Sequence, residues 1–112
     1  MNKELNNWLA KNVMGWTLGK LVHHAYQPST WFENNIVKMN YKYWNPTEDM
    51  NQAMVCWKKA KIKMYVSFDP DDPDVFWVSR YVDEIERRVT TASLEELPLA
   101  ICSAIKQAVE NK

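Results

Sequence analysis

Hydrophobic residues recur at helical spacing in three stretches of the chain. Residues 2–14 predict a first helix, and Gly15 ends it because glycine readily takes the left-handed conformation common at helix ends. Residues 46–61 predict a second helix with Thr47 as its N-cap, and residues 97–110 predict a third. The side chains expected to be buried are Leu5, Trp8, Leu9 and Val13; Met50, Ala53, Met54 and Trp57; and Leu97, Ile101, Ala104, Ile105 and Ala108.

Polar and apolar residues alternate with a period of two in other stretches, which is typical of strands. The alternation predicts strands over residues 36–44 and 62–68. Two further strands are predicted over residues 75–82 and 85–92. The 75–82 stretch is apolar on both faces, which favours a central position in a sheet.

The region before the second helix is the least regular part of the chain. Residues 20–26 are compatible with a strand, and residues 31–35 are interpreted as a loop. The elements then follow the order α-(ββ)-α-βββ-α. This order predicts an α+β fold, a mostly antiparallel sheet of three to five strands packed with three helices in a layered α/β/α-type sandwich. A length of 112 residues suits one domain, residues 1–112.

Short motifs at both ends and in the middle of the chain carry a family resemblance. The first predicted helix ends in Val-Met-Gly-Trp at residues 13–16. The second begins with Thr-Glu-Asp at residues 47–49 and contains Ala53 and Trp57. The third begins with Pro-Leu-Ala-Ile-Cys at residues 98–102. In order and spacing the chain resembles the phage ABA-sandwich family of small phage and prophage proteins.

The resemblance implies helices and a sheet in layers, and a phage or prophage origin. It implies no catalytic residues. Residues 17–45 depart from the family pattern, so the resemblance assigns no ligand contact within them.

Charge is balanced overall but unevenly distributed. Lys and Arg number 14 and Asp and Glu number 14, so the formal net charge is zero. Residues 1–61 carry 8 basic and 4 acidic side chains, a net charge of +4, and residues 62–112 carry 6 and 10, a net charge of −4. A neutral total argues against a dedicated nucleic-acid binder, which has a basic surplus. The uneven distribution either allows two copies to meet head to tail or has no consequence.

The sequence predicts a protein of the bacterial host cytoplasm. Cys56 and Cys102 each lie on an apolar helical stripe, the usual place of a buried free thiol. Residues 2–12 have no continuous apolar core, so we expect no signal peptide. No apolar run approaches the roughly 20 residues of a membrane span, so we expect no membrane partner.

The sequence favours neither a metal site nor catalysis. His23 and His24 are adjacent, and adjacent side chains of a strand point to opposite faces, which disfavours a shared ion. The acidic stretch 69–74 lacks the glycine and glutamate of a calcium loop and is interpreted as a hairpin turn. Cys102 lies in apolar surroundings that do not favour a reactive thiolate. We therefore expect no catalytic residue, no bound metal and no cofactor.

A nucleic-acid-binding alternative rests on element order alone. Residues 47–110 share the helix, three strands, helix order of double-stranded RNA-binding domains. Such domains place lysines at the start of the last helix, where this chain has Glu95 and Glu96. Because carboxylates repel phosphates, nucleic acid is a disfavoured partner.

Aromatic residues form the main candidate site. The chain has six Trp, five Tyr and three Phe, and several lie near predicted element ends or in the irregular region. Lys42, and Arg80 on the predicted strand 75–82, are the cations expected to lie beside them. Aromatic and cationic side chains together suit a flat ligand or a protein hot spot. The alternative is that they fill a small core. The candidate binding residues are Trp16, Trp31, Phe32, Lys42, Trp44 and Arg80.

These observations favour a small, non-enzymatic phage or prophage accessory protein. We expect it to bind a host or phage protein, for example as an antagonist of a host defence factor. The alternative is a homo-oligomer that binds a small molecule or nucleotide at its subunit junction. An RNA-binding domain is a third, weaker hypothesis.

Overall fold

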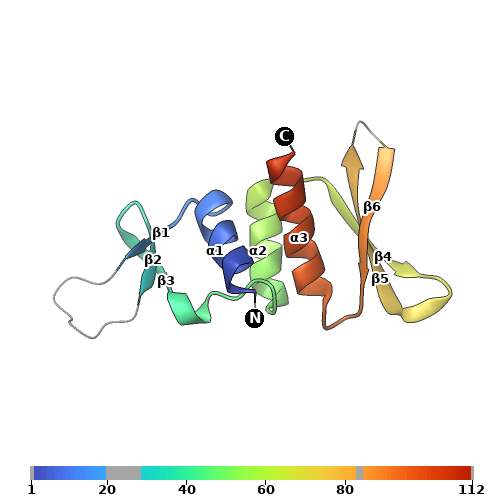
Figure 1. Ribbon diagram of the computed structural model, residues 1–112, viewed down its shortest axis with the longest axis horizontal. Helices are drawn as coiled ribbons and strands as arrows, with labels where there is room; N and C mark the ends of the chain where they lie inside the picture. The colour runs from blue at the N-terminus through green and yellow to red at the C-terminus, as the bar shows by residue number, and fades with distance from the viewer. Residues whose placement is uncertain (1, 20–28, 83–84, 112) are drawn as a thin grey trace.

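Three helices form the middle of the molecule, and one small sheet lies at each end (Figure 1). The computed structural model describes residues 2–19, 29–82 and 85–111. The helices are α1 (Lys3–Asn12), α2 (Met50–Ala60) and α3 (Leu97–Glu110). The molecule measures 56 × 29 × 18 Å, and its radius of gyration of 15.8 Å exceeds the roughly 13 Å of a compact chain of this length. The excess follows from the two sheets, which lie on opposite sides of the layer of helices (Figure 1).

The first sheet contains β1 (Thr17–Gly19), β2 (Thr30–Glu33) and β3 (Ile36–Asn40), all antiparallel and in that order. A two-residue turn joins β2 to β3, and both of its residues, Asn34 and Asn35, have positive φ angles of 50° and 68°. Asparagine tolerates this conformation, and a turn of this kind matches the twist of paired strands. A 3₁₀ helix, η1 (Tyr41–Tyr43), follows β3 and leads towards α2.

The second sheet contains β4 (Met64–Asp69), β5 (Asp72–Val82) and β6 (Ile85–Ala92), also antiparallel. β5 is the central strand, as its apolar faces predicted. This sheet packs on α3 through β5 and β6. Ala100 and Ala104 of α3 are buried, and their small side chains allow the helix to lie close to its neighbours.

The segment 44–47, between η1 and α2, is held by all three helices. From α1, the carbonyl of the buried Asn6 accepts the indole N–H of Trp44 at 2.7 Å, and its side-chain oxygen accepts the backbone N–H of Thr47 at 3.2 Å. From α2, Gln52 accepts the backbone N–H of Asn45 at 2.5 Å. From α3, the Cys102 thiol donates to the carbonyl of Pro46 at 3.3 Å.

Those contacts also set the start of α2. Asp49 is the N-cap, and its carboxylate accepts the backbone N–H of Gln52 at 3.1 Å. The prediction of Thr47 as N-cap is therefore wrong. Thr47 is buried and its backbone N–H is bound to Asn6, so it belongs to the turn before the helix. α2 ends at Lys61, whose left-handed φ of 57° directs the chain towards β4.

The α+β class, the three helices and the antiparallel strands are confirmed, and the order of elements agrees with the prediction in outline. The strands belong to two sheets of three, where we expected one sheet of three to five. The loop predicted over residues 31–35 is wrong, because β2 pairs there with both β1 and β3. The strand predicted over 36–44 ends at Asn40, where η1 begins. The strand considered over 20–26 lies outside the described residues.

Replacing Asn6 tests the hydrogen bonds around the 44–47 segment. We expect Asn6→Ala to lower the free energy of unfolding by about 2–3 kcal/mol, because it leaves the buried N–H of Thr47 without a partner. Urea denaturation measures the change. Asn51→Ala, at an exposed position of α2, is the matched control and should shift stability by less than about 0.5 kcal/mol. Equal effects of the two variants would contradict the role of Asn6.

Candidate functional site

Three of the six candidate residues are buried tryptophans. Trp16 and Trp44 are 8% and 5% exposed, and their ring centroids lie 4.7 Å apart. Gly15, with a φ of +74°, turns the chain after α1 so that the Trp16 N–H reaches the carbonyl of Ala10 at 2.8 Å. Trp31 is fully buried beside Tyr41, with ring centroids 6.0 Å apart. All three tryptophans therefore belong to the core, and Trp44 alone among them also lines the cleft described below.

The other three candidates are spread along the molecule. Phe32, on β2, is half-buried, and an added Cβ on Gly19 would lie 3.3 Å from its ring. Lys42, on η1, is exposed, and its ammonium lies 5.1 Å from the centroid of the Tyr43 ring. Arg80 lies on β5, in the sheet on the other side of the helices (Figure 1). The expectation that Arg80 lies beside Lys42 and Trp44 is therefore wrong, because the strands form two separate sheets.

A cleft lies between α1 and the η1 region, and more of its surface is apolar than polar. Its volume is about 300 Å³, and Lys42 and Trp44 are among its lining residues. Asn7 donates a hydrogen bond to the hydroxyl of Tyr41 at 3.3 Å across it, and Asn6 donates to the side chain of Asn45 at 3.0 Å. The full lining is Lys3, Asn6, Asn7, Tyr41, Lys42, Trp44 and Asn45. No carboxylate contributes to it, so the lining is amide, aromatic and cationic.

Beside the cleft, the chain exposes a run of apolar and cationic side chains from β3 into η1, which we call the 36–43 segment. Ile36 and Val37 are 61% and 51% exposed, and Tyr43 is 62% exposed. Lys42 stands over the Tyr43 ring. β3 is an edge strand of its sheet, so one side of its backbone has no neighbouring strand among the described residues. Edges of this kind pair readily with strands of other chains.

The two thiols are structural. Burial raises the pKa of Cys56 to about 12, and burial together with the nearby Cys56 thiol raises the pKa of Cys102 further. A protonated, buried thiol is not a nucleophile at neutral pH. Within the described part of the chain, no three His, Cys, Asp or Glu side chains are grouped as a metal site would require. His23 and His24 lie outside the described residues.

Among the helices of the described residues, none has the length and apolar character that a membrane span requires.

The comparison with family models decides the family. The model of the phage ABA sandwich domain matches residues 7–105. The chain belongs to this family. The resemblance seen in the sequence motifs is thereby confirmed, and the family description attaches no enzymatic activity to its members.

A solved member of the same fold supports the architecture. The chain is similar to a phage protein from Bacillus cereus ATCC 14579, known from a crystal structure, with a TM-score of 0.60 and 14% sequence identity. The likeness covers 96% of this chain and 86% of that one. At this identity it shows the fold alone. None of the curated proteins matches this chain.

Sequence reasoning missed most of the cleft. Asn6, Asn7 and Asn45 were not candidates, because asparagine is common on surfaces and carries no motif. The position of Asn6 on the first helix is a sequence signal that could have indicated the cleft. Asn6 stands three and four residues before Leu9 and Ala10, which places a polar residue on the buried face of α1. A buried amide requires hydrogen-bond partners from another part of the chain.

Alanine variants of Trp31 and Tyr43 distinguish a core side chain from a surface side chain. We expect Trp31→Ala to reduce the free energy of unfolding by about 3–5 kcal/mol, because its indole is fully buried. Tyr43→Ala removes an exposed ring and should change stability by less than about 0.5 kcal/mol. Urea denaturation of both variants measures the difference. An unchanged midpoint for Trp31→Ala would show that the core assignment is wrong.

Thiol labelling tests the two cysteines. We expect neither Cys56 nor Cys102 to react with an aromatic disulfide reagent at pH 8 in the folded protein, and both to react in denaturant. Because unfolded thiols ionise from about pH 8.5 while the folded ones keep their protons, their contribution favours the folded state below that pH and is lost as pH rises towards 12. Rapid labelling of one thiol in the folded state would contradict this assignment.

Proposed function

We propose that this protein is a non-enzymatic phage accessory protein that binds another protein, of the phage or its host, in the bacterial cytoplasm. The observation that carries the proposal is the 36–43 segment, where an edge strand and exposed apolar side chains lie together. Small monomeric proteins rarely expose contiguous apolar residues without a use for them.

The chemistry of the segment suits a protein partner. A strand of the partner pairs with the free backbone of β3, as in β-augmentation. Ile36 and Val37 supply apolar contact, and Tyr43 supplies a large ring of the type enriched in binding hot spots. The ammonium of Lys42 above that ring offers a carboxylate of the partner an ion pair.

The non-enzymatic part of the proposal rests on the thiols and the family. Cys56 and Cys102 are buried with raised pKa values, so neither is available as a nucleophile. The family match brings no reaction to the chain. A protein of this kind acts by occupying a surface, and the antagonism of a host factor expected from the sequence is one result of such occupation.

The cleft supports a second candidate function, the binding of a small anionic molecule such as a nucleotide. Its volume of about 300 Å³ is at the lower limit of ligand pockets. Lys3 and Lys42 line it and supply two cations to an anionic ligand, while the Glu48 carboxylate behind the lining accepts a hydrogen bond from Asn45 at 2.6 Å. In the homo-oligomeric form of this hypothesis, a second copy completes the pocket.

Native mass spectrometry of the tagged protein, purified gently from its bacterial host, tests both functions. We expect a complex that carries a polypeptide other than a second 13.2 kDa copy of this chain. Tyr43→Ala should weaken that complex by about 30-fold, the loss typical of a hot-spot side chain. Tyr65→Ala, at a tyrosine of β4 that is 49% exposed, is the matched control and should leave the complex intact.

Other outcomes decide against the protein-binding proposal. An added mass below about 1 kDa that disappears in Lys42→Ala would support the small-molecule function. A complex lost equally in Tyr43→Ala and Tyr65→Ala would show that the 36–43 segment is not the binding surface. A bare protein in all samples would contradict both functions.

A further inference from the structure

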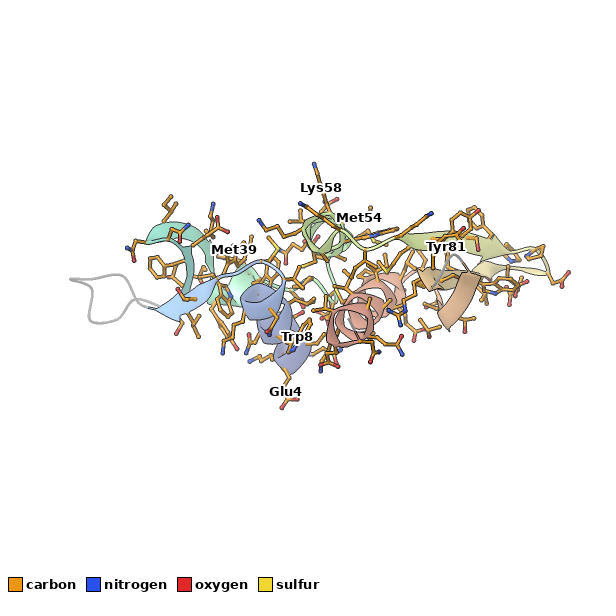
Figure 2. All side chains as sticks on the ribbon, turned by 90° about the horizontal axis from the view of Figure 1, so that it is seen from above. Glu4, Trp8, Met39, Met54, Lys58 and Tyr81 are labelled. Atoms are coloured by element: carbon orange, nitrogen blue, oxygen red, sulfur yellow. The ribbon has the colours of Figure 1, made fainter. Side chains whose placement is uncertain are left out.

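The outer side of α2 carries an apolar groove surrounded by lysines, which we call the α2 groove. Figure 2 shows Met54 and Lys58 projecting from this side of α2, away from Trp8 on the opposite side of the molecule. The groove has a volume of about 260 Å³ and is lined by Met54, Trp57, Lys58, Lys61 and Ile62. Met54 is 46% exposed, and the indole N–H of Trp57 donates to the carbonyl of Ile62 at 2.8 Å, which fixes the floor.

The α2 groove is strongly basic. Four lysines, at positions 58, 59, 61 and 63, fall within six consecutive residues, and all four are exposed. Among the described residues, none of them forms an ion pair with a carboxylate. Lys63 stands 4.8 Å from the centroid of the Tyr81 ring. The groove therefore combines an apolar floor with a cationic rim, and it favours an occupant that is apolar and acidic.

The far end of the second sheet has the opposite composition. Phe68 is 68% exposed and pairs with Phe76, with ring centroids 5.2 Å apart. The β4–β5 turn between them carries four aspartates, at positions 69, 71, 72 and 74. The backbone N–H groups of Asp71 and Asp74 donate to the side chains of Asp69 and Asp72, at 2.8 and 3.0 Å. This acidic turn presents the exposed ring of Phe68 with carboxylates around it, and the half-buried Phe76, which packs against the core, supports that ring.

The acidic turn cannot occupy the α2 groove of its own chain. β4 begins two residues after Ile62 and runs straight to Asp69, so its six residues hold the turn about 20 Å from the groove. β4 is also paired along its length with β5. A second copy of the chain is therefore needed to bring the two surfaces together.

We propose that the α2 groove binds the acidic β4–β5 turn of a second copy of this protein. The exposed phenyl ring of Phe68 lies on the apolar floor beside Met54, and the aspartates pair with Lys58 and Lys61 at the rim. An apolar centre with a charged, complementary rim is the usual composition of a protein interface. The net charges of +4 over residues 1–61 and −4 over residues 62–112 also favour contact between the first part of one copy and the second part of another.

Each copy has one groove and one turn, so the same contact closes a two-fold pair when it is made twice. It extends into a head-to-tail chain when the geometry does not close. The contact uses α2 and the second sheet and leaves the 36–43 segment free. Self-association and the proposed binding of a partner protein are therefore independent, and one can fail without the other.

Charge reversal on the purified full chain tests the contact. We expect the unmodified protein to show a mass above the 13.2 kDa of one chain in sedimentation velocity at low salt, and to dissociate towards that mass in about 0.5 M salt. Lys58→Glu with Lys61→Glu should weaken association at least about 30-fold, and so should Asp71→Lys with Asp74→Lys. All four positions are exposed, so the folded state should be unaffected.

Mixing the two charge-reversed proteins is the decisive measurement. In each variant alone, every contact contains one charge-reversed surface. In the mixture, the unmodified groove of one protein meets the unmodified turn of the other, and the two reversed surfaces meet each other, so association should return. Lys11→Glu, at an exposed position of α1 outside the groove, the turn and the cleft, should leave association unchanged.

Three results would overturn the proposal. The first is a single chain at all concentrations and salt conditions. The second is self-association that survives both charge reversals, or that the mixture does not restore. The third is a monomer that binds RNA through Lys58 and Lys61 at low salt, which would assign the α2 groove to a nucleic acid instead.

Discussion

The hydrogen bonds around residues 44–47 are the constraint on which the arrangement of the helices depends. Asn6 of α1, Gln52 of α2 and Cys102 of α3 each bind the backbone or the indole of this short segment. Because the segment is largely buried, its polar groups have no access to water and must find partners within the protein. A shift of any one helix would break at least one of these bonds, so the segment sets the positions of all three.

The placement of the sheets decides which surfaces remain open. A single sheet covered by three helices would bury one entire face of its strands. Two small sheets on opposite sides of the helices leave more of each strand in contact with solvent, and they leave the outer side of α2 uncovered (Figure 2). The exposed residues Ile36, Tyr43, Met54 and Phe68 follow from this arrangement. In this architecture a small part of the strand surface is buried in the core, and much of that surface remains available for contacts with other chains.

The proposed contact of the 36–43 segment with a partner protein and the proposed contact between two copies depend on different interactions. The 36–43 segment offers a free strand edge and a tyrosine held under a lysine, so backbone hydrogen bonds and one large ring dominate there. The α2 groove and the acidic turn are matched by charge around apolar centres, so their association depends on ionic strength. A phage protein with both surfaces can present several copies of its partner-binding segment at once, which strengthens binding without new contacts.

The sequence by itself determined the class of elements, because helical periodicity in 97–110 and alternation in 62–92 depend only on neighbouring residues. It also determined the family, through motifs inside those elements. Only the tertiary structure decided that Trp16, Trp31 and Trp44 are core rather than surface, since burial of a tryptophan depends on distant segments. It likewise separated Arg80 from the cleft, because the division of strands between two sheets is set by long-range pairing that no local pattern records.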